Sequence, residues 1–302
     1  MNNTRHCLLC GSSQLRLIHQ KDMWKYRQCG NCGLVGMDPH PADDELFGSY
    51  GDYLPKDPRK IKAWKAMMRP IIVNAARLIN SEPGRLLDIG SGYGFFLEEM
   101  KNNGWEVEGI ELSETGRQYT QRQINVPVHS RPVESLSLPE NHFDVVTLFY
   151  VIEHLPDPVS TLREVRRIIR PGGTLLLRWP HSTPVVKLLG PFSRMFDLYH
   201  TPFHLYDFSP KTISMLLAAS SFDHIRTVIG GYTLPEPRIN RYASIITGIF
   251  AEALFRLSGG RVLVPGVSKT SVARNSGKIP AGMTSNNGEP IKPICKMPTR
   301  YK

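Results

Sequence analysis

The sequence predicts an α/β protein with a doubly wound, mostly parallel sheet, preceded by a small cysteine-rich unit. Three observations lead to this prediction. Short apolar runs alternate with amphipathic segments from residue 85 onward, which is the pattern of successive strand–helix–strand units. A glycine-rich turn directly follows the first apolar run, and two Cys-x-x-Cys pairs lie within the first 32 residues.

The composition is that of an ordinary globular chain. Its 302 residues are 41% apolar and 21% charged, which excludes collagen, coiled coil and wholesale disorder. The formal net charge is +10, but residues 266–302 hold seven basic residues against one acidic residue. The remaining charge is nearly balanced and indicates no basic groove for nucleic acid. No run approaches the ~18–20 apolar residues of a membrane span. No secretory signal pattern opens the chain, so we expect a cytoplasmic protein.

The two cysteine pairs predict a structural zinc site. Cys7 and Cys10 form one pair, Cys29 and Cys32 form the other, and a glycine follows each pair. Two such turns can place four thiolates around a tetrahedral ion, and the glycine permits a positive φ. Four thiolates leave no open coordination position, so the metal would be structural rather than catalytic. The alternative is four buried thiols without a ligand. Cys295 is expected to be a bystander.

Shifts in composition divide the chain into four parts. We expect a zinc ribbon at 1–36, an acidic connector at 37–57 and the α/β domain at 58–264. The basic segment 265–302 is rich in Ser, Gly, Asn, Pro and Lys, which predicts a disordered tail. The alternative is that its stretch VSKTSVARN supplies a strand of the sheet. Residues 182–208 would form an insertion after the fifth strand.

The α/β domain is expected to open with a helix at residues 58–80. Ile61, Trp64 and Met68 begin an apolar series with spacings of three and four residues, which is typical of an amphipathic helix. Pro70 interrupts the series and predicts a kink or two shorter helices.

From residue 85 the expected strands and helices alternate. The strands are short and apolar, and the helices begin at capping residues or end at glycine or proline. In chain order we expect strand 85–90, helix 95–104, strand 106–112, helix 113–123, a short strand within 125–136, strand 142–154, helix 157–169, strand 174–180, helix 209–221, strand 223–232 and helix 243–260.

The glycine-rich turn predicts a site for an adenosyl ligand. Gly90, Gly92 and Gly94 follow the first strand, Asp88 lies two positions before them, and Glu111 ends the next strand. A carboxylate at the end of the second strand, here that of Glu111, can accept hydrogen bonds from both ribose hydroxyls. A dinucleotide site has G-x-G-x-x-G spacing and faces a pyrophosphate, which Asp88 would repel. The positively charged amino group of a methionine moiety would instead be attracted by the Asp88 carboxylate, and this favours S-adenosylmethionine. The alternative is a tight turn without a ligand.

Four blocks in the same order resemble the class I S-adenosylmethionine-dependent methyltransferases: DIGSGYG, GIELS, FDVVTLFYVIEHLPDP and LREVRRIIRPGGTLLL. The resemblance covers roughly residues 60–260 and implies a Rossmann-like, seven-stranded sheet. It also implies that Val133 and Glu134 lie near adenine. The implied donor-binding residues are Asp88, Gly90, Gly92, Gly94, Glu111, Val133, Glu134 and Tyr150.

Two further blocks resemble zinc-ribbon methyltransferases of sugar and surface-glycan biosynthesis, and the second block is also similar to one in a wider group of small-molecule methyltransferases. These are CGLVGMDPHPADDELFGSYGDY and TPFHLYDFSPKTISMLLAASSF. The resemblance implies a small-molecule acceptor, which would be a hydroxyl or carbon of a sugar, nucleotide-sugar or glycan. Trp179-Pro180-His181 departs from the Pro-Asn that often follows the fifth strand in such relatives.

Three residues are candidates for catalysis. Methyl transfer to oxygen can use a general base with a pKa near neutrality, for which histidine is suited. His154 and His181 follow the fourth and fifth strands, at the edge where open α/β sheets bind ligands, and Glu153 adjoins His154. His200 and His204 lie in the insertion, which could roof the pocket. The alternatives are that His154 only organises its loop and that no histidine acts as a base.

Two other functions stay open at this point: a zinc-ribbon RNA base methyltransferase and a catalytically silent donor-binding scaffold. Residues 34–57 carry six acidic residues and one basic residue, and the chain has no Asn-Pro-Pro-Tyr motif, which argues against RNA. The intact Asp88, glycines and Glu111 argue against a silent scaffold. The apolar segment 245–257 could contact a membrane peripherally or pack against the sheet.

Overall fold

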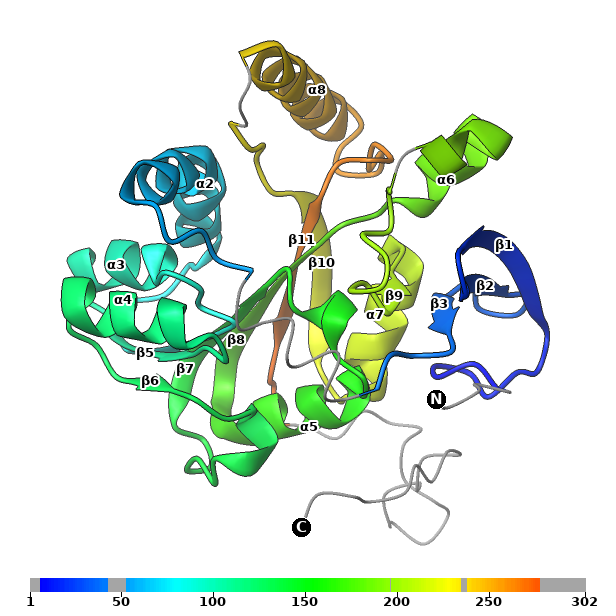
Figure 1. The fold of residues 1–302 in the computed structure, drawn as a ribbon. Helices are drawn as coiled ribbons and strands as arrows, with labels where there is room; N and C mark the ends of the chain where they lie inside the picture. Colours follow the sequence, from blue (N-terminus) through cyan, green and yellow to red (C-terminus); the bar gives the residue numbers. More distant parts are fainter. Residues whose placement is uncertain (1–5, 43–52, 196, 235–237, 278–302) are drawn as a thin grey trace, which may run out of the picture.

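The computed structural model describes residues 6–42, 53–195, 197–234 and 238–277. It contains a large central sheet flanked by helices and a small sheet near the N-terminus (Figure 1). Among these residues, no helix is long and apolar enough to cross a membrane.

The large sheet contains seven strands in the described part of the chain, in the order β10-β11-β8-β7-β4-β5-β6. The strands from β6 to β8 run parallel, whereas β11 is antiparallel to both of its neighbours. The chain order reverses beside β4, because β5 lies on one side of it and β7 on the other. Such a switch point opens a crevice at the carboxyl ends of the strands. The bounds are β4 (Arg85–Ile89), β5 (Glu106–Ile110), β6 (Val128–His129), β7 (Phe143–Phe149), β8 (Ile169–Trp179), β10 (Asp223–Ile229) and β11 (Lys269–Arg274).

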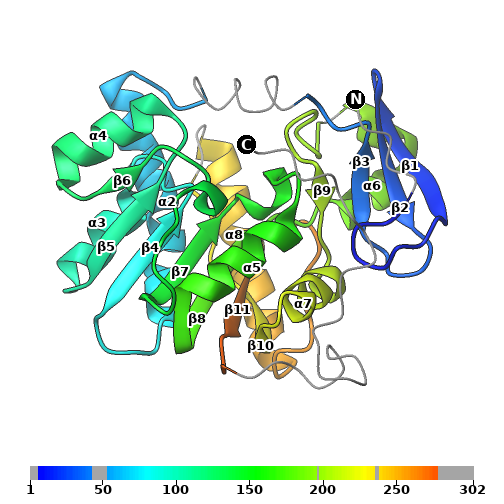
Figure 2. The same cartoon turned by 90° about the horizontal axis from the view of Figure 1, so that it is seen from below.

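Helices cover both faces of this sheet (Figures 1 and 2). Successive strand residues point to opposite faces, so Leu86 and Leu87 belong to two different apolar cores. One core packs the sheet against α5 and α7, and the other packs it against α2 and α3. The bounds are α2 (Pro58–Leu78), α3 (Phe95–Asn102), α4 (Glu114–Ile124), α5 (Pro158–Ile168), α6 (Thr183–Leu189), α7 (Pro210–Ala219) and α8 (Arg238–Leu257).

The first helix of the domain, α2, is continuous and contains Pro70 in its interior. The prediction of two shorter helices is therefore wrong. The Asp57 carboxylate caps the helix by accepting hydrogen bonds from the backbone N–H of Arg59 at 2.7 Å and Lys60 at 3.3 Å. This cap and the burial of Ile71 and its neighbours offset the single backbone donor that a proline lacks.

The small sheet combines the cysteine-rich unit with a strand from the predicted insertion. Its order is β1-β2-β3-β9, with β1 (Leu15–Lys21), β2 (Trp24–Cys29), β3 (Val35–Asp38) and β9 (Tyr206–Asp207). The backbone N–H of Met37 also donates to the carbonyl of Leu205 at 2.8 Å. The ribbon and the insertion thus share one sheet, which the sequence did not predict.

The predicted disordered tail is wrong for residues 269–274. These residues form β11, which lies inside the large sheet between β10 and β8. The segment looks like a loop in sequence because it begins with Lys-Thr-Ser, but these polar side chains are buried and bonded. The Lys269 amine donates to the carbonyls of Val264 and Val267, and the Ser271 hydroxyl accepts from Trp179 Nε1 at 3.0 Å. Residues 278–302, with Cys295, lie outside the described residues.

Candidate functional site

A cavity of about 1590 Å³ lies at the carboxyl ends of β4, β5 and β7. The residues that follow these three strands line it, together with residues of α2 and of the insertion. Ligand pockets usually enclose roughly 300–1,000 Å³, so this cavity has room for two molecules side by side. Its position is the one that the switch point beside β4 predicts.

The glycine-rich turn forms one wall of the cavity. Gly90 has φ of +75° and Gly92 has φ of +55°, a region that side chains rarely adopt. A Cβ at Gly90 would also collide with Val151. The backbone can therefore approach a ligand closely here, and the binding of the donor by Gly90 and Gly92 stays a prediction.

Gly94 lies elsewhere than the resemblance implied. It is the residue before α3, with φ of +67°, and it is not among the residues that line the cavity. A Cβ on Gly94 would approach Thr120 of α4 to 2.6 Å. Glycine is thus needed at position 94 for two reasons: the turn before α3 has a positive φ there, and α4 lies too close for a side chain.

Glu111 holds a fixed carboxylate at the end of β5. The side chain is 3% exposed. Its Oε2 accepts hydrogen bonds from the Gly92 N–H at 2.7 Å and the Tyr53 hydroxyl at 3.1 Å, and its Oε1 accepts from the Ser113 N–H at 2.7 Å. Four sites on a carboxylate can accept, so acceptor capacity remains for a ligand. Tyr53 was not predicted, since nothing in its local sequence indicates a partner so far along the chain.

Asp88 supplies a second carboxylate beneath the turn. It is 3% exposed, and its Oδ1 accepts a hydrogen bond from the Thr147 hydroxyl at 2.6 Å. Burial raises the pKa of Asp88 to about 7, and the charge of Glu111 adds to this rise. A ligand cation would stabilise the ionised form. Two neighbouring carboxylates therefore suit a positively charged ligand and disfavour a phosphate.

Val133 and Glu134 also line the cavity, in a short 3-10 helix at Val133–Ser135. Glu134 Oε1 accepts a hydrogen bond from the Thr161 hydroxyl. The structure thus brings both predicted adenine-side residues to the same cavity as Asp88 and Glu111.

Tyr150 reaches the cavity wall from the end of β7. Its hydroxyl accepts a hydrogen bond from Arg178 Nε at 2.8 Å, and the guanidinium lies 5.4 Å from the ring centroid. Arg178 is 2% exposed and also donates to the carbonyls of Gly230 and Gly231. This buried arginine fixes the tyrosine. No local pattern predicted its role, because its partners are distant in the chain.

Glu153 and His154 line the cavity, as predicted. Glu153 is 1% exposed, and burial raises its pKa to about 8. The Nδ1–H of His154 donates to the carbonyl of Phe203 at 2.9 Å, because a carbonyl can only accept. Burial lowers the pKa of His154 to about 4, so the ring is neutral near pH 7 and its Nε2 carries the lone pair.

His181 does not join Glu153 and His154. Pro180 lines the large cavity, but His181 lines a second hollow of about 610 Å³ beside the ribbon residues Cys29 and Gly33. Neighbouring residues of an extended chain point to opposite sides, which explains the separation. Burial lowers the pKa of His181 to about 4. The structure thus places His181 in a different hollow from the other two catalytic candidates, Glu153 and His154.

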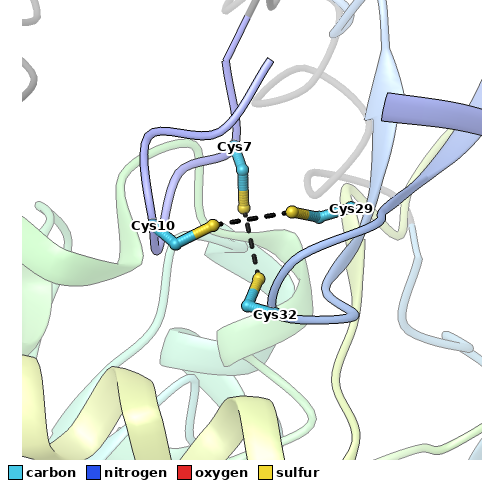
Figure 3. Close-up of side chains that lie close together, drawn as sticks. All are labelled: Cys7, Cys10, Cys29 and Cys32. Carbon is cyan, nitrogen blue, oxygen red and sulfur yellow. Dashed lines mark hydrogen bonds between the residues drawn. The ribbon is translucent and has the colours of Figure 1, made fainter. Parts of the chain in front are cut away.

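The four cysteines of the ribbon converge on one point (Figure 3). The sulfurs of Cys7 and Cys32 are 3.4 Å apart, those of Cys10 and Cys29 are 3.5 Å apart, and all four lie within 4.8 Å of one another. Zinc bonds of about 2.3 Å in a tetrahedron give sulfur–sulfur distances of about 3.8 Å. The geometry and the donor set are therefore compatible with zinc.

Comparisons with known proteins agree with this architecture. Residues 62–226 match the family model described as a methyltransferase domain. A ubiquinone biosynthesis O-methyltransferase from Pseudomonas aeruginosa is 32% identical over 130 residues, which are 41% of this chain and 56% of that protein. One from Pseudomonas putida is 31% identical over 155 residues, which are 48% of this chain and 67% of that protein. This chain thus spans little more than half the length of the first relative.

Solved structures share the fold at low sequence identity. A SAM-dependent methyltransferase from Archaeoglobus fulgidus has a TM-score of 0.50 and 21% identity, over 72% of this chain and 100% of that chain. One from Thermotoga maritima has a TM-score of 0.53 and 15% identity, over 76% of this chain and 99% of that chain. The family match spans more than half of the sequence. The chain therefore belongs to the methyltransferase domain family and has the fold of the class I S-adenosylmethionine-dependent methyltransferases.

Proposed function

We propose that this protein transfers the methyl group of S-adenosylmethionine to a hydroxyl of a small molecule. The observation that carries the proposal is the pair of buried carboxylates, Asp88 and Glu111, beside a glycine turn at the switch point of the sheet. The relatives named as ubiquinone biosynthesis O-methyltransferases support an oxygen acceptor. A sugar, nucleotide-sugar or glycan acceptor, methylated on oxygen or carbon, is the finer expectation from the resemblance of the blocks at residues 32–53 and 201–222.

The donor would be held by four kinds of contact. Glu111 would accept hydrogen bonds from the ribose hydroxyls, and Asp88 would attract the amino group of the methionine moiety. Gly90 and Gly92 would let the backbone come close, and Val133 would pack near adenine. S-adenosylmethionine supplies an activated methyl group, so the protein's main task is to position the two reactants and exclude water.

The acceptor would lie in the part of the cavity bordered by the insertion. His200, Phe203 and Leu205 line the cavity there, opposite the turn that contains Glu153. The N–H of Leu205 donates to the carbonyl of Glu153 at 2.8 Å, which joins the two walls. This wall contains rings and apolar groups that can pack on a sugar or aromatic face.

A structural zinc in the ribbon would support the acceptor side. The ribbon residue Tyr26 is fully buried, and its hydroxyl donates to the carbonyl of His204 at 3.1 Å. The four thiolates of the ribbon would fix the strands that hold this contact. Metal binding far from the reaction would thereby stabilise the wall of the acceptor pocket.

A product analysis tests the proposed function. The purified protein would be incubated with S-adenosylmethionine carrying a labelled methyl group and with separate panels of phenols, sugars, nucleotide-sugars and RNA. We expect label in a small-molecule hydroxyl and an equal amount of S-adenosylhomocysteine. Label in RNA bases would favour the RNA methyltransferase instead. Donor binding without transfer to any panel would favour the silent scaffold.

A further inference from the structure

A carboxylate and two imidazoles gather at the acceptor side of the cavity. Glu153, His154 and His204 each offer one ligand atom, and these atoms all lie within 4.8 Å of one another. The first two belong to a short 3-10 helix after β7, whereas His204 comes from the insertion. All three line the cavity that also contains Asp88 and Glu111. The cluster is separate from the four cysteines, which lie in the ribbon.

Glu153 is the most informative member of this cluster. It is 1% exposed, and neither of its carboxylate oxygens has a hydrogen-bond partner among the described residues. Buried carboxylates in proteins are almost always hydrogen-bonded, paired with a cation or bound to a metal. A buried carboxylate that lies close to two imidazoles and has no donor is stabilised either by a proton or by a bound cation, and the two imidazoles supply further ligand atoms for a cation.

His154 has the hydrogen bond that is typical of a metal-binding histidine. Its Nδ1–H donates to the backbone carbonyl of Phe203 at 2.9 Å. Histidines that bind metals usually donate their other ring N–H to a carbonyl or carboxylate, which fixes the tautomer and the ring orientation. With the proton on Nδ1, the atom of His154 that would bind a metal is Nε2.

The backbone around His204 is held on both sides. The carbonyl of His204 accepts from the Tyr26 hydroxyl at 3.1 Å, and the next residue, Leu205, donates to the carbonyl of Glu153 at 2.8 Å. The His204 ring is perpendicular to that of His154, at a centroid distance of 4.8 Å. His200 adds a third imidazole, whose ring centroid lies 4.9 Å from that of His204. Ligands fixed in this way need little rearrangement to bind an ion.

We propose that Glu153, His154 and His204 bind a divalent transition-metal ion beside the methyl acceptor. Two imidazoles and one carboxylate suit Mn²⁺, Fe²⁺, Co²⁺ and Zn²⁺. Three protein ligands leave coordination positions open, in contrast to the four thiolates of the ribbon.

The role of this ion rests on the proposed function. An acceptor hydroxyl bound to the ion would have a lower pKa and would release its proton to solvent. The oxygen would then form a bond to the methyl carbon while the carbon–sulfur bond breaks and sulfur keeps the electron pair. No side-chain base is required for this step.

Binding of Mn²⁺ alone tests the site. Mn²⁺ prefers oxygen and nitrogen donors to thiolates, so the ribbon should not contribute. Titration of the full-length protein, followed by the electron paramagnetic resonance signal of free Mn²⁺, should show about one ion bound per chain. We expect at least tenfold weaker binding for Glu153→Gln and His204→Ala, with circular dichroism used to confirm that both variants are folded.

A matched control is available on the large sheet. Glu108 and His129 form a carboxylate–imidazole pair, 2.9 Å apart, and neither is among the residues that line the cavity. Glu108→Gln and His129→Ala should bind Mn²⁺ as the unmodified protein does. Absence of Mn²⁺ binding in the unmodified protein would overturn the proposal, as would equal binding by the cavity variants.

The metal site and the proposed function can fail separately. If Mn²⁺ binds at the cluster but no acceptor is methylated, the metal site stands and the proposed function fails. If methyl transfer persists in excess chelator and Mn²⁺ does not bind, the proposed function stands and the metal site fails. Calorimetry with S-adenosylmethionine should give the same donor affinity for His204→Ala as for the unmodified protein.

Discussion

The three buried carboxylates of the cavity differ in their partners, and this difference separates their roles. Glu111 accepts from two backbone N–H groups and a hydroxyl, and Asp88 accepts from one hydroxyl. Glu153 has no hydrogen-bond partner among the described residues. A carboxylate with several donors is stabilised in its charged form, whereas a buried one with few donors depends on a cation or a proton. The Glu111 carboxylate is therefore held in one orientation by the protein itself, as the proposed donor site requires.

Asp88 should make the stability of the protein depend on pH. Its pKa of about 7 lies above the ordinary value of 3.8, so between these values the folded protein retains a proton that the unfolded chain releases. Stability therefore falls as pH rises from about 4 to about 7. The Asp88→Asn variant lacks this titration. Relative to the variant, the unmodified protein should lose about 4 kcal/mol of unfolding free energy across this window.

Chemical denaturation of both proteins at several pH values, without donor, measures this effect. Titrating groups that do not interact with Asp88 contribute equally to the two curves, so the difference between the curves reports on Asp88 and on the Glu111 carboxylate coupled to it. The difference should level off above about pH 7. Parallel curves would show that Asp88 has an ordinary pKa in the folded protein.

At the residue scale, the sequence predicted those residues that lie at a fixed spacing from a recognisable local motif. The cysteine pairs, Asp88 and Glu111 each lie at a fixed offset from a glycine or a strand end. His181 was assigned to the wrong pocket, because a one-residue step along an extended chain changes the side to which a residue points. Tyr53 and Arg178 were missed because their partners are far away in the sequence.

At the scale of elements, strands with an apolar pattern were predicted well and polar strands were not. The parallel strands β4, β5, β7 and β8 are buried runs with flanking turn signals. The strand β11 carries Lys269, Thr270 and Ser271 on a fully enclosed position of the sheet. Its polar groups are satisfied only by tertiary partners such as Trp179, which no local pattern reveals.

Removal of β11 should therefore destabilise the whole domain. A chain that ends at Val264 lacks the strand between β10 and β8, and the backbone groups of both neighbours lose their hydrogen-bond partners. We expect the melting temperature to fall by about 10 °C or more, or the protein to become insoluble. A chain that ends at Gly277 is the control and retains the strand. Equal melting temperatures for the two truncated chains would contradict the assignment of β11.

The ribbon should hold one tightly bound zinc ion through its four cysteines. Elemental analysis after dialysis against a chelator should give about one zinc per chain, because an open three-ligand site releases its metal more readily than four thiolates do. Cys32→Ser should abolish the retained zinc, and hydrogen exchange at Tyr206 and Asp207 should increase, since these residues form β9, which pairs with β3. Cys295→Ser is the matched control and should retain the metal. Full zinc retention in Cys32→Ser would contradict the predicted ligand set.

At the scale of the molecule, residues of the connector, the insertion and the α/β domain line one cavity, and the ribbon lies beside the insertion. The ribbon contacts the insertion through Tyr26 with His204 and through an ion pair between Lys21 and Asp197, 2.8 Å apart. The end of the cavity proposed for the donor is lined by residues of short sequence motifs, which the sequence analysis could name. The end proposed for the acceptor is assembled from segments that are distant in the chain, so its residues emerge only from the fold.

The most direct test of the central claim is the binding of S-adenosylmethionine at Glu111. Glu111→Gln must turn an NH₂ group toward the N–H of Gly92 or of Ser113, which disturbs the site and removes the charge. A charge-assisted hydrogen bond contributes about 1.5–3 kcal/mol, so calorimetry should show affinity about ten- to hundredfold weaker than in the unmodified protein. Glu108→Gln, on the same strand, should bind normally. Undiminished affinity in Glu111→Gln, or no binding by the unmodified protein, would contradict the account.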